Sequence, residues 1–397
     1  MRVTIVSRIY APEVSAASGL LQSWAEEFRD RGCDVTVLTT KPPRGATLAD
    51  PPGVTVRRAR VLRDKQQYVR GYIPYLSFDV PLAFRLLFSR RSDLYVVEPP
   101  PTTTAVVVTL ARLRRTPVVV DAADLWSDAA AMVSTNKLVP LMLQRLELWG
   151  LKRANHLFAA HTPLTGRFRE LGIETPTTPI GFGADTSIFR YDGEPAPEPP
   201  VFVYAGTHSE WHGAGIFVEA FPAVLREYPE ARLLFIGNGA DRDLLRTRVE
   251  ALGIASSVEL RTPISPAQLA PILAGATASL ASLKPHQGYD YAFTTKAYSS
   301  LAAGCPVIFA GTGPTVDFLN NAENPDAGVA LDYDIGATAG AMIAAAASPL
   351  PPQARAELAN WAAERYALDA IAKRVVDESF AVVEKSTPRR GGSTKRS

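Results

Sequence analysis

The chain has 397 residues, 47% of them hydrophobic and 21% charged, with two cysteines and a formal net charge of +2. This length favours two domains over one core, and the composition is typical of a globular protein. The small net charge does not suggest nucleic acid as a partner, and the lone Cys33 and Cys305 indicate neither a disulfide framework nor a zinc site. Without a signal peptide or a bilayer-length apolar run, we expect a cytoplasmic protein, at most peripheral to a membrane.

The first half of the chain alternates strand and helix patterns. Residues 2–7 are rich in β-branched side chains, residues 19–31 have helical periodicity that ends at Gly32, and residues 34–39 form the next predicted strand. Such a β-α-β unit builds a parallel sheet. The remaining elements expected in this half are strands at 54–58, 94–98, 117–120, 156–160 and 178–180 and a helix at 163–171.

A proline-rich, acidic stretch at residues 185–200 is typical of an interdomain linker. The β-α alternation restarts after it, which predicts a second parallel α/β domain. Two doubly wound domains in tandem would face each other across a cleft, with ligands at the carboxyl ends of the strands. The expected strands are 201–204, 232–236, 258–260, 276–283 and 306–310, and the expected helices are 216–227, 241–252, 266–273, 295–303, 336–347 and the amphipathic stretch 354–383.

The charge is distributed unevenly between these two halves. Residues 1–185 carry 24 Lys and Arg against 17 Asp and Glu, whereas residues 186–397 carry 18 against 23. A basic first domain favours an anionic acceptor or surface, but a solvated arginine-rich surface explains the same counts equally well. Residues 386–397 are polar and basic, and we predict that this tail is disordered.

Two glycine turns follow strands of the second domain. A glycine at such a turn lets backbone N–H groups approach a phosphate, and nearby imidazoles and amides add donors. Each turn is also explained as a plain strand-to-helix connection, so neither is specific alone. The candidates are Gly206, Thr207, His208 and His212 in the first turn and Gly237 and Asn238 in the second.

The segment 282–304 supplies cations around a loop that leads into a helix. Lys284, His286 and Lys296 suit a phosphate, and Thr295 stands at the helix start, where a hydroxyl also serves as an ordinary N-cap.

A third group of polar residues lies in the first domain. Asp121, Asp124 and Asp128 follow an apolar strand, and one of them is placed to accept a proton from an acceptor hydroxyl. N-capping is the alternative role, above all for Asp128.

The region 57–88 interleaves arginines with aromatic and aliphatic residues. This mixture is typical of a surface that meets lipid headgroups or a lipid-linked acceptor, so peripheral membrane contact through residues 57–88 is one interpretation. A partly buried insertion is the other, and it is about as well supported. Stacking on nucleic acid finds no support elsewhere in the chain.

Taken in order, these segments resemble the retaining GT-B glycosyltransferases of family 4, in the bacterial branch that builds O-antigen and capsule. The order and spacing of the matches carry the resemblance, which spans about residues 1–383. The matched segments are residues 31–39 (RGCDVTVLT, family RGHEVTVLT), 123–128 (ADLWSD, RDLWPE), 181–189 (GFGADTSIF, NGVDTELF), 204–208 (YAGTH, the same) and 296–308 (KAYSSLAAGCPVI, KLFEYMAAGRPVI).

The resemblance implies a GT-B fold with an acceptor domain at residues 1–185 and a nucleotide-sugar domain at 186–365. It implies a helix at 366–385 that crosses back to the first domain. The expected donor is a nucleoside diphosphate sugar, most simply UDP-linked, and the acceptor is a lipid-linked glycan or a small molecule. No metal or other cofactor is expected, because basic side chains replace it. Asp124 and Lys296 would be catalytic, and the donor would contact Gly206, Thr207, His208, His212, Gly237, Asn238, Pro263, Ile264, Lys284, Asp290, Thr295 and Ser299.

The chain departs from the family pattern at an acid pair. The second acid position is Ser299, the first falls near Tyr291, and Asp290 replaces the first only with a small shift. Four functions therefore stay open. They are a sugar transferase of cell-surface polysaccharide synthesis, a transferase that tailors a small natural product, a non-catalytic GT-B scaffold or activator, and, ranked last, a nucleotide-sugar 2-epimerase.

Overall fold

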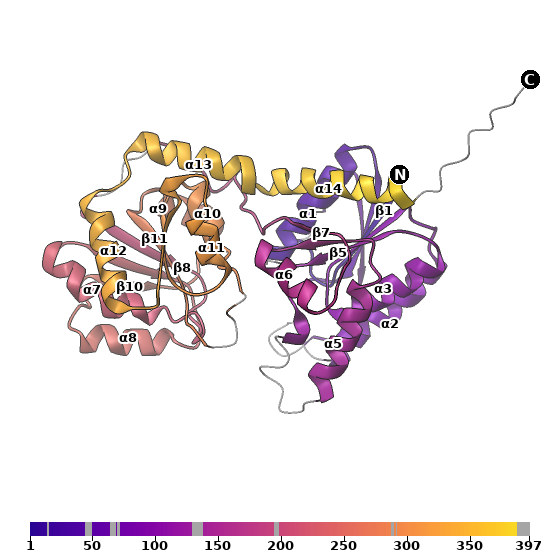
Figure 1. The fold of residues 1–397 in the computed structure, drawn as a ribbon, viewed down its shortest axis with the longest axis horizontal. Helices are drawn as coiled ribbons and strands as arrows, with labels where there is room; N and C mark the ends of the chain where they lie inside the picture. The colour runs from indigo at the N-terminus through magenta and orange to yellow at the C-terminus, as the bar shows by residue number, and fades with distance from the viewer. Residues whose placement is uncertain are drawn as a thin grey trace, which may run out of the picture. The chain divides into compact units, whose positions relative to one another are not determined.

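The computed structural model describes residues 1–13, 16–43, 50–63, 69, 72–128, 138–193, 198–286, 290 and 292–386. The chain forms two compact units, Met1–Gly181 with Ile371–Ser397 and Phe182–Ala370. Each unit is a parallel sheet with helices around it (Figure 1). The predicted architecture of two doubly wound α/β domains is confirmed. None of the helices in the described ranges is long and apolar enough to cross a membrane.

The sheet of the first unit has the order β3-β2-β1-β4-β5-β6-β7, and every pairing is parallel. The chain builds outward from β1 in one direction and from β4 in the other, so the switch point lies between these two strands. The strands are β1 (Arg2–Val6), β2 (Asp34–Thr40), β3 (Val54–Ala59), β4 (Leu94–Val97), β5 (Val118–Ala122), β6 (His156–Ala159) and β7 (Thr177–Pro179). The helices are α1 (Ala16–Asp30), α2 (Tyr72–Phe88), α3 (Pro101–Leu113), α5 (Leu138–Leu151), α6 (Thr162–Glu170) and most of α14 (Leu368–Ser386).

The sheet of the second unit has the order β10-β9-β8-β11-β12-β13, with the switch point between β8 and β11. Alternate residues of its strands enter two separate cores, as the two-residue period of a strand requires. Val203 packs in one core, and Phe202 and Tyr204 pack in the other. The strands are β8 (Val201–Ala205), β9 (Arg232–Ile236), β10 (Val258–Arg261), β11 (Ala278–Leu283), β12 (Val307–Gly311) and β13 (Gly328–Leu331). The helices are α7 (Gly215–Glu227), α8 (Arg242–Ala251), α9 (Pro266–Ala274), α10 (Lys296–Ala302), α11 (Pro314–Asn320), α12 (Ile335–Ala347) and α13 (Pro352–Tyr366).

Several elements differ from the sequence expectation. Helix α2 runs through Pro81, a residue that ordinarily ends a helix, so composition alone gave no helix there. The expected amphipathic stretch 354–383 is two helices, because Ala367 is extended and its neighbours hydrogen-bond to the backbone of Ala184. The expected linker also begins later than residue 185, since Phe189 is buried in the core of the second unit. The predicted disordered tail lies outside the described residues, apart from Ser386 at the end of α14.

A buried arginine of α13 binds the backbone carbonyls at the end of α9 in the second unit. Arg355 of α13 has no exposed surface, and its guanidinium donates to the carbonyls of Ala274 and Ala276 at 2.6 and 2.9 Å. Ala274 is the last residue of α9, whose final carbonyls have no partner within the helix. Arg355 therefore supplies the donors that the end of α9 needs.

We expect Arg355→Met to lower the free energy of unfolding by about 3 kcal/mol, because methionine fills much of the same volume but leaves two buried carbonyls without charged donors. Urea denaturation followed by circular dichroism measures the change. Arg226→Met on the exposed face of α7 is the matched control and is expected to change stability by less than about 0.5 kcal/mol. Equal effects of the two substitutions would contradict this role of Arg355.

Candidate functional site

The second unit places its candidate residues at the carboxyl edge of its sheet. Gly206 follows β8, Gly237 follows β9 and Lys284 follows β11. Strands β8 and β11 flank the switch point, which is where open parallel sheets bind ligands. The order of the strands thus brings together residues that are far apart in the sequence.

The two glycine turns touch each other through their backbones. Gly206 and Gly237 have φ angles of 143° and 153°, which side chains rarely adopt. A Cβ on Gly237 would lie 1.9 Å from the carbonyl oxygen of Gly206, and one on Gly206 would lie 2.9 Å from the ammonium nitrogen of Lys296. Only glycine fits at both positions, so the backbone beside Lys296 stays uncovered.

Lys296 carries a buried ammonium group with no hydrogen-bond partner among the described residues. Its Nζ lies 3.5 Å from the centre of the Tyr204 ring, a cation–π contact that replaces only part of the lost hydration. Burial of the ammonium lowers the pKa of Lys296 to about 7, although the residue as a whole is only half-buried. The group is thus a desolvated cation without a counterion in the part of the chain that the structure describes.

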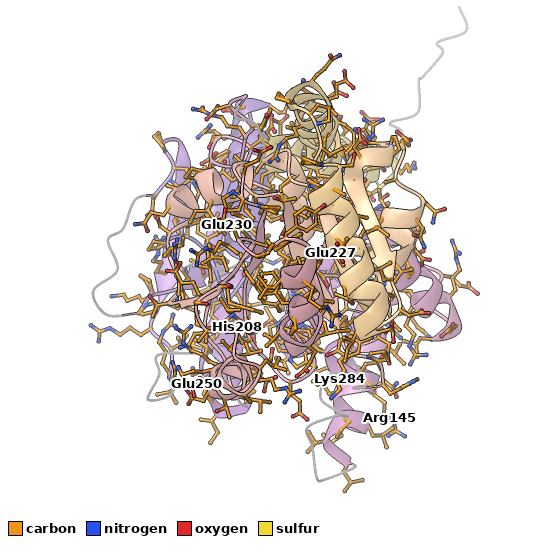
Figure 2. The ribbon with its side chains drawn as sticks, turned by 90° about the vertical axis from the view of Figure 1, so that its left-hand side faces the viewer. Arg145, His208, Glu227, Glu230, Glu250 and Lys284 are labelled. Atoms are coloured by element: carbon orange, nitrogen blue, oxygen red, sulfur yellow. The ribbon has the colours of Figure 1, made fainter. Side chains whose placement is uncertain are left out.

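His208 is fully buried beside this lysine, and neither of its ring nitrogens has a partner in the described part of the chain. Its backbone is held firmly, because its N–H donates to Asn238 and its carbonyl accepts from Asp241. Burial, Lys296 and Arg242 together lower its pKa to about 4. At neutral pH the ring is therefore uncharged, with one nitrogen as a donor. Figure 2 labels His208 and Lys284 on the second unit.

His212 lies in the same loop but in a different setting. Its Nδ1 lies 2.7 Å from the Ser209 hydroxyl, and its ring stacks on Trp211 at 3.6 Å between centroids. Burial, with contributions from Lys296 and His208, lowers its pKa to about 3. The loop is anchored to the sheet edge, since the backbone N–H of Lys284 donates to the Trp211 carbonyl.

The other donor candidates occupy several places around this edge. The Asp290 carboxylate accepts from the backbone of His286 and the hydroxyl of Thr312, which ties it to the loop after β12. Thr295 is the N-cap residue of α10 but makes no side-chain capping bond, so capping does not explain it. Two further candidates make local hydrogen bonds: the Thr207 carbonyl accepts from the Tyr204 hydroxyl, and the Asn238 side-chain oxygen accepts from the backbone of Gly239. Of the remaining candidates, Ile264 and Ser299 are half-buried and Pro263 is exposed. Tyr291 lies outside the described residues.

Arg242 is a supporting residue that the sequence analysis missed. Its guanidinium donates to the carbonyls of Gly237, Leu260 and Arg261 at 2.8 to 2.9 Å. It thereby joins the ends of β9 and β10 and fixes the second glycine turn. The available signal was its position as the first helical residue after the Gly237 turn.

The first unit gathers acids at the corresponding edge of its own sheet. Glu98 follows β4, Asp121 lies near the end of β5, and Asp124 follows β5. Burial raises the pKa of Glu98 to about 7, and burial together with Glu98 and Asp124 raises the pKa of Asp121 well above its usual value. Desolvation raises the pKa of Asp124 to about 6, but this residue keeps an exposed surface and solvent limits the shift.

One buried cation accompanies these acids. Arg8 follows β1, is 2% exposed, and lies over the Tyr75 ring at 4.2 Å. Its charge favours the ionised form of Glu98, which also accepts a 2.9 Å hydrogen bond from Ser7. The sequence analysis missed both Arg8 and Glu98. Arg8 is the first charged residue after the strand predicted at 2–7, and Glu98 is the last residue of the strand predicted at 94–98, so a charge at a strand end was the signal.

The helical turn after Asp124 is held by carboxylates in structural roles. Glu147 of α5 accepts hydrogen bonds from the backbone of Trp126 and from the backbone and hydroxyl of Ser127. Asp128 is already helical and forms an ion pair with Arg167 at 3.3 Å, so the N-capping role considered for it is wrong. Asp124 is therefore the acid of this turn that stays exposed. Within the described ranges no group of three or more His, Cys, Asp or Glu residues is placed to hold a metal ion.

Comparison with known proteins assigns a family to this pair of sheets. Residues 20–183 match the model of the glycosyl transferase 4-like domain, and residues 199–347 match that of the glycosyl transferases group 1. The chain belongs to the GT-B glycosyltransferases. The two models together cover most of its length, and the boundary between them falls in the segment that precedes β8. No curated protein sequence matches the chain.

Solved glycosyltransferase structures share this fold along the whole chain. Sucrose-phosphate synthase (tll1590) from Thermosynechococcus elongatus is similar with a TM-score of 0.73 at 17% identity, covering 97% of this chain and 99% of that one. Anabaena Alr3699/HepE in complex with UDP gives 0.69 at 13% identity, covering 96% and 100%. WaaG, a glycosyltransferase of lipopolysaccharide biosynthesis, gives 0.64 at 15% identity, covering 95% and 99%.

The lowered pKa values of His208 and His212 predict that both rings stay neutral down to about pH 5. Because folding lowers these values, the stability that they contribute is present above pH 6.5 and is lost as the pH falls toward 4. Nitrogen-15 NMR titration of the imidazoles measures the midpoints, and Lys296→Met is expected to raise both. Midpoints near 6.5 in the folded protein would contradict the described burial.

Proposed function

We propose that the chain transfers a sugar from a nucleoside diphosphate sugar to an acceptor hydroxyl, with retention and without a metal ion. The observation that carries the proposal is the buried Lys296 ammonium, which lacks a counterion beside the uncovered backbone of Gly206. A buried cation without a partner destabilises the protein, and an anionic ligand offsets that cost. A diphosphate would supply the negative charge that the Lys296 ammonium needs and acceptor oxygens for the Lys296 and His208 donors.

The proposed donor contacts follow from the positions of the remaining candidates. Lys296, His208 and the Gly206 and Gly237 turns would hold the diphosphate, with Lys284 and Thr295 nearby. Pro263 and Ile264 would contact the base, as the family resemblance implies, and Ser299 and Asp290 would contact the ribose and the sugar. A UDP-linked hexose is the proposed donor, and the solved UDP and UDP-glucose complexes of Anabaena HepE support this choice within the shared fold.

In the proposed reaction the bond between the anomeric carbon and the diphosphate oxygen breaks as the acceptor hydroxyl attacks from the same face. Negative charge grows on the departing diphosphate, and Lys296 stabilises it in a site without bulk water. The proton of the acceptor hydroxyl passes to a carboxylate, for which Asp124 is the proposed group. Its exposed carboxyl is ionised above pH 6 and can reach an acceptor, whereas burial favours the protonated form of Asp121.

The proposed acceptor is a lipid-linked glycan intermediate of cell-surface polysaccharide synthesis, met at the inner face of the membrane. Helix α2 within the region 57–88 supports this part of the proposal, because it is apolar on two opposite faces. Phe78, Leu82 and Leu86 are buried, and the other face exposes Ile73, Leu76, Val80, Phe84 and Leu87. An exposed apolar helix face beside arginines suits the membrane interface. A small natural product is the alternative acceptor, and a non-catalytic scaffold is the alternative function.

We expect Lys296→Met to weaken UDP binding at least about thirtyfold in calorimetry, since one buried charged contact is lost. Wild-type affinity should also fall as the pH rises above about 7, because the diphosphate binds the protonated lysine. The variant should lose that pH dependence. Arg226→Met removes a charge elsewhere in the second unit and should leave UDP affinity unchanged. Equal affinity of the Lys296 variant and the wild type would exclude this donor site.

We expect Asp124→Asn to lower the rate of sugar transfer at least about a hundredfold and to leave UDP affinity unchanged, because the amide cannot accept the proton. Asp128→Asn, four residues away and paired with Arg167, is the matched control and should keep most of the activity. The assay follows nucleotide release from a panel of nucleotide sugars. Nucleotide binding without transfer by the wild type, on any donor and acceptor tried, would favour the scaffold alternative.

A further inference from the structure

The first unit has a basic pocket at the amino-terminal edge of its sheet, the edge opposite to Glu98 and Asp121. The pocket has a volume of about 540 Å³ and lies where β5 and β6 begin. Four cations from three segments line it. Arg112 lies in the last turn of α3 and Arg115 just after it, Arg153 lies just after α5, and Lys385 lies in the last turn of α14. The other lining residues are Thr116, Pro117, Asn155 and Ser386.

No carboxylate lines this pocket, and no ion pair in the described part of the chain involves any of its four cations. Cations near helix ends commonly complement the carbonyl end of the helix dipole, and this effect explains each of them singly. It does not explain why they converge on one concave surface, where like charges repel. Asn155 adds donors, since its side-chain oxygen already accepts from the Val118 backbone. Arg153 already donates to the Trp149 carbonyl at 3.4 Å and lies over the Trp149 ring, so the other three cations and Asn155 supply most of the donors to the pocket.

The backbone at Arg115 indicates that the position of this side chain matters. Arg115 has a φ angle of +54°, a conformation that glycine usually supplies after a helix. The carbonyl of Arg115 accepts from Arg91 at 2.8 Å, and the same guanidinium contacts the Thr116 hydroxyl. The fold therefore holds an arginine at the pocket where a glycine would be less strained.

Exposed apolar residues lie in the segments next to those that line the pocket. Leu113 of α3 is 73% exposed, and Phe88 at the end of α2 is 80% exposed. Arg114 donates to the carbonyls of Leu87 and Ser89, so the ends of α2 and α3 are tied together beside the pocket. A soluble phosphate needs no apolar border. A lipid surface supplies both a phosphate and an apolar layer just below it.

We propose that the pocket formed by Arg112, Arg115, Arg153 and Lys385 binds the phosphate group of an anionic phospholipid, with Leu113 and Phe88 entering the interface beside it. The inference deepens the membrane part of the proposed function and names a headgroup site for it. It does not depend on sugar transfer, because the binding needs no donor.

The test is sedimentation of the full chain with phosphatidylcholine vesicles, with and without phosphatidylglycerol. The pocket variant is Arg112→Gln/Arg115→Asn, since asparagine tolerates a positive φ. The control is Arg226→Gln/Arg246→Gln, which removes the same charge from exposed helix positions of the second unit. We expect the pocket variant to lose about thirtyfold in partitioning onto the anionic vesicles and the control to lose less than about threefold.

Two further measurements make the result decisive. Phenylglyoxal modifies arginines of the wild type, and anionic vesicles should protect Arg112, Arg115 and Arg153, a readout that needs no folded variant. Phe88→Ser/Leu113→Ser should weaken vesicle binding while NMR shifts with inorganic phosphate stay the same. Equal losses in the pocket and control variants, no protection, or binding of inorganic phosphate without vesicle binding would each overturn the proposal. Lys296→Met and Asp124→Asn should bind vesicles as the wild type does, which separates this test from that of sugar transfer.

Discussion

The candidate site depends on the burial of the Lys296 ammonium, which has no counterion within the described ranges. The desolvated cation lies over the Tyr204 ring and beside the uncovered backbone of Gly206. Its charge helps to keep His208 and His212 neutral, so the two imidazoles serve as donors or acceptors rather than as further cations. The fold maintains this arrangement because Gly206 and Gly237 approach too closely for any side chain, and because Arg242 fixes the strand ends behind them.

The carboxyl edges of the two sheets carry opposite kinds of polar side chain, hydrogen-bond donors in the second unit and carboxyl groups in the first. At the carboxyl edge of the second sheet, the buried Lys296 and His208 side chains have no hydrogen-bond acceptors among the described residues. At the carboxyl edge of the first sheet, Glu98 and Asp121 are buried carboxyl groups whose protonated forms are favoured by burial, while Asp124 stays accessible. The same backbone topology thus presents donors for an anion in one unit and proton-accepting groups in the other. This division suits a reaction between an anionic donor and a hydroxyl acceptor.

The surface of the first unit combines an exposed apolar helix face with a basic pocket. Helix α2 is apolar on opposite faces, and only one of them is covered by the core. The basic pocket lies at the end of α3, and Arg114, just after α3, donates to the backbone at the end of α2. Cations placed beside exposed apolar side chains favour an interface at which charge and hydrocarbon occur together. The positive balance of the first half of the sequence is thereby concentrated, in part, at one defined place.

The sequence by itself determined the strand and helix alternation, the two parallel α/β domains and the glycine turns, because these depend on periodicity and on neighbours a few residues apart. The YAGTH segment and the segment from Lys296 onward also indicate the family from sequence alone. Only the tertiary structure decided which side chains meet. The Lys296–Tyr204 contact, the Arg8 and Glu98 pair and the basic pocket join residues from distant segments, and local patterns carry no information on sheet order or register. The same limit explains helix α2, whose proline and mixed composition conceal a helix that packing against the core stabilises.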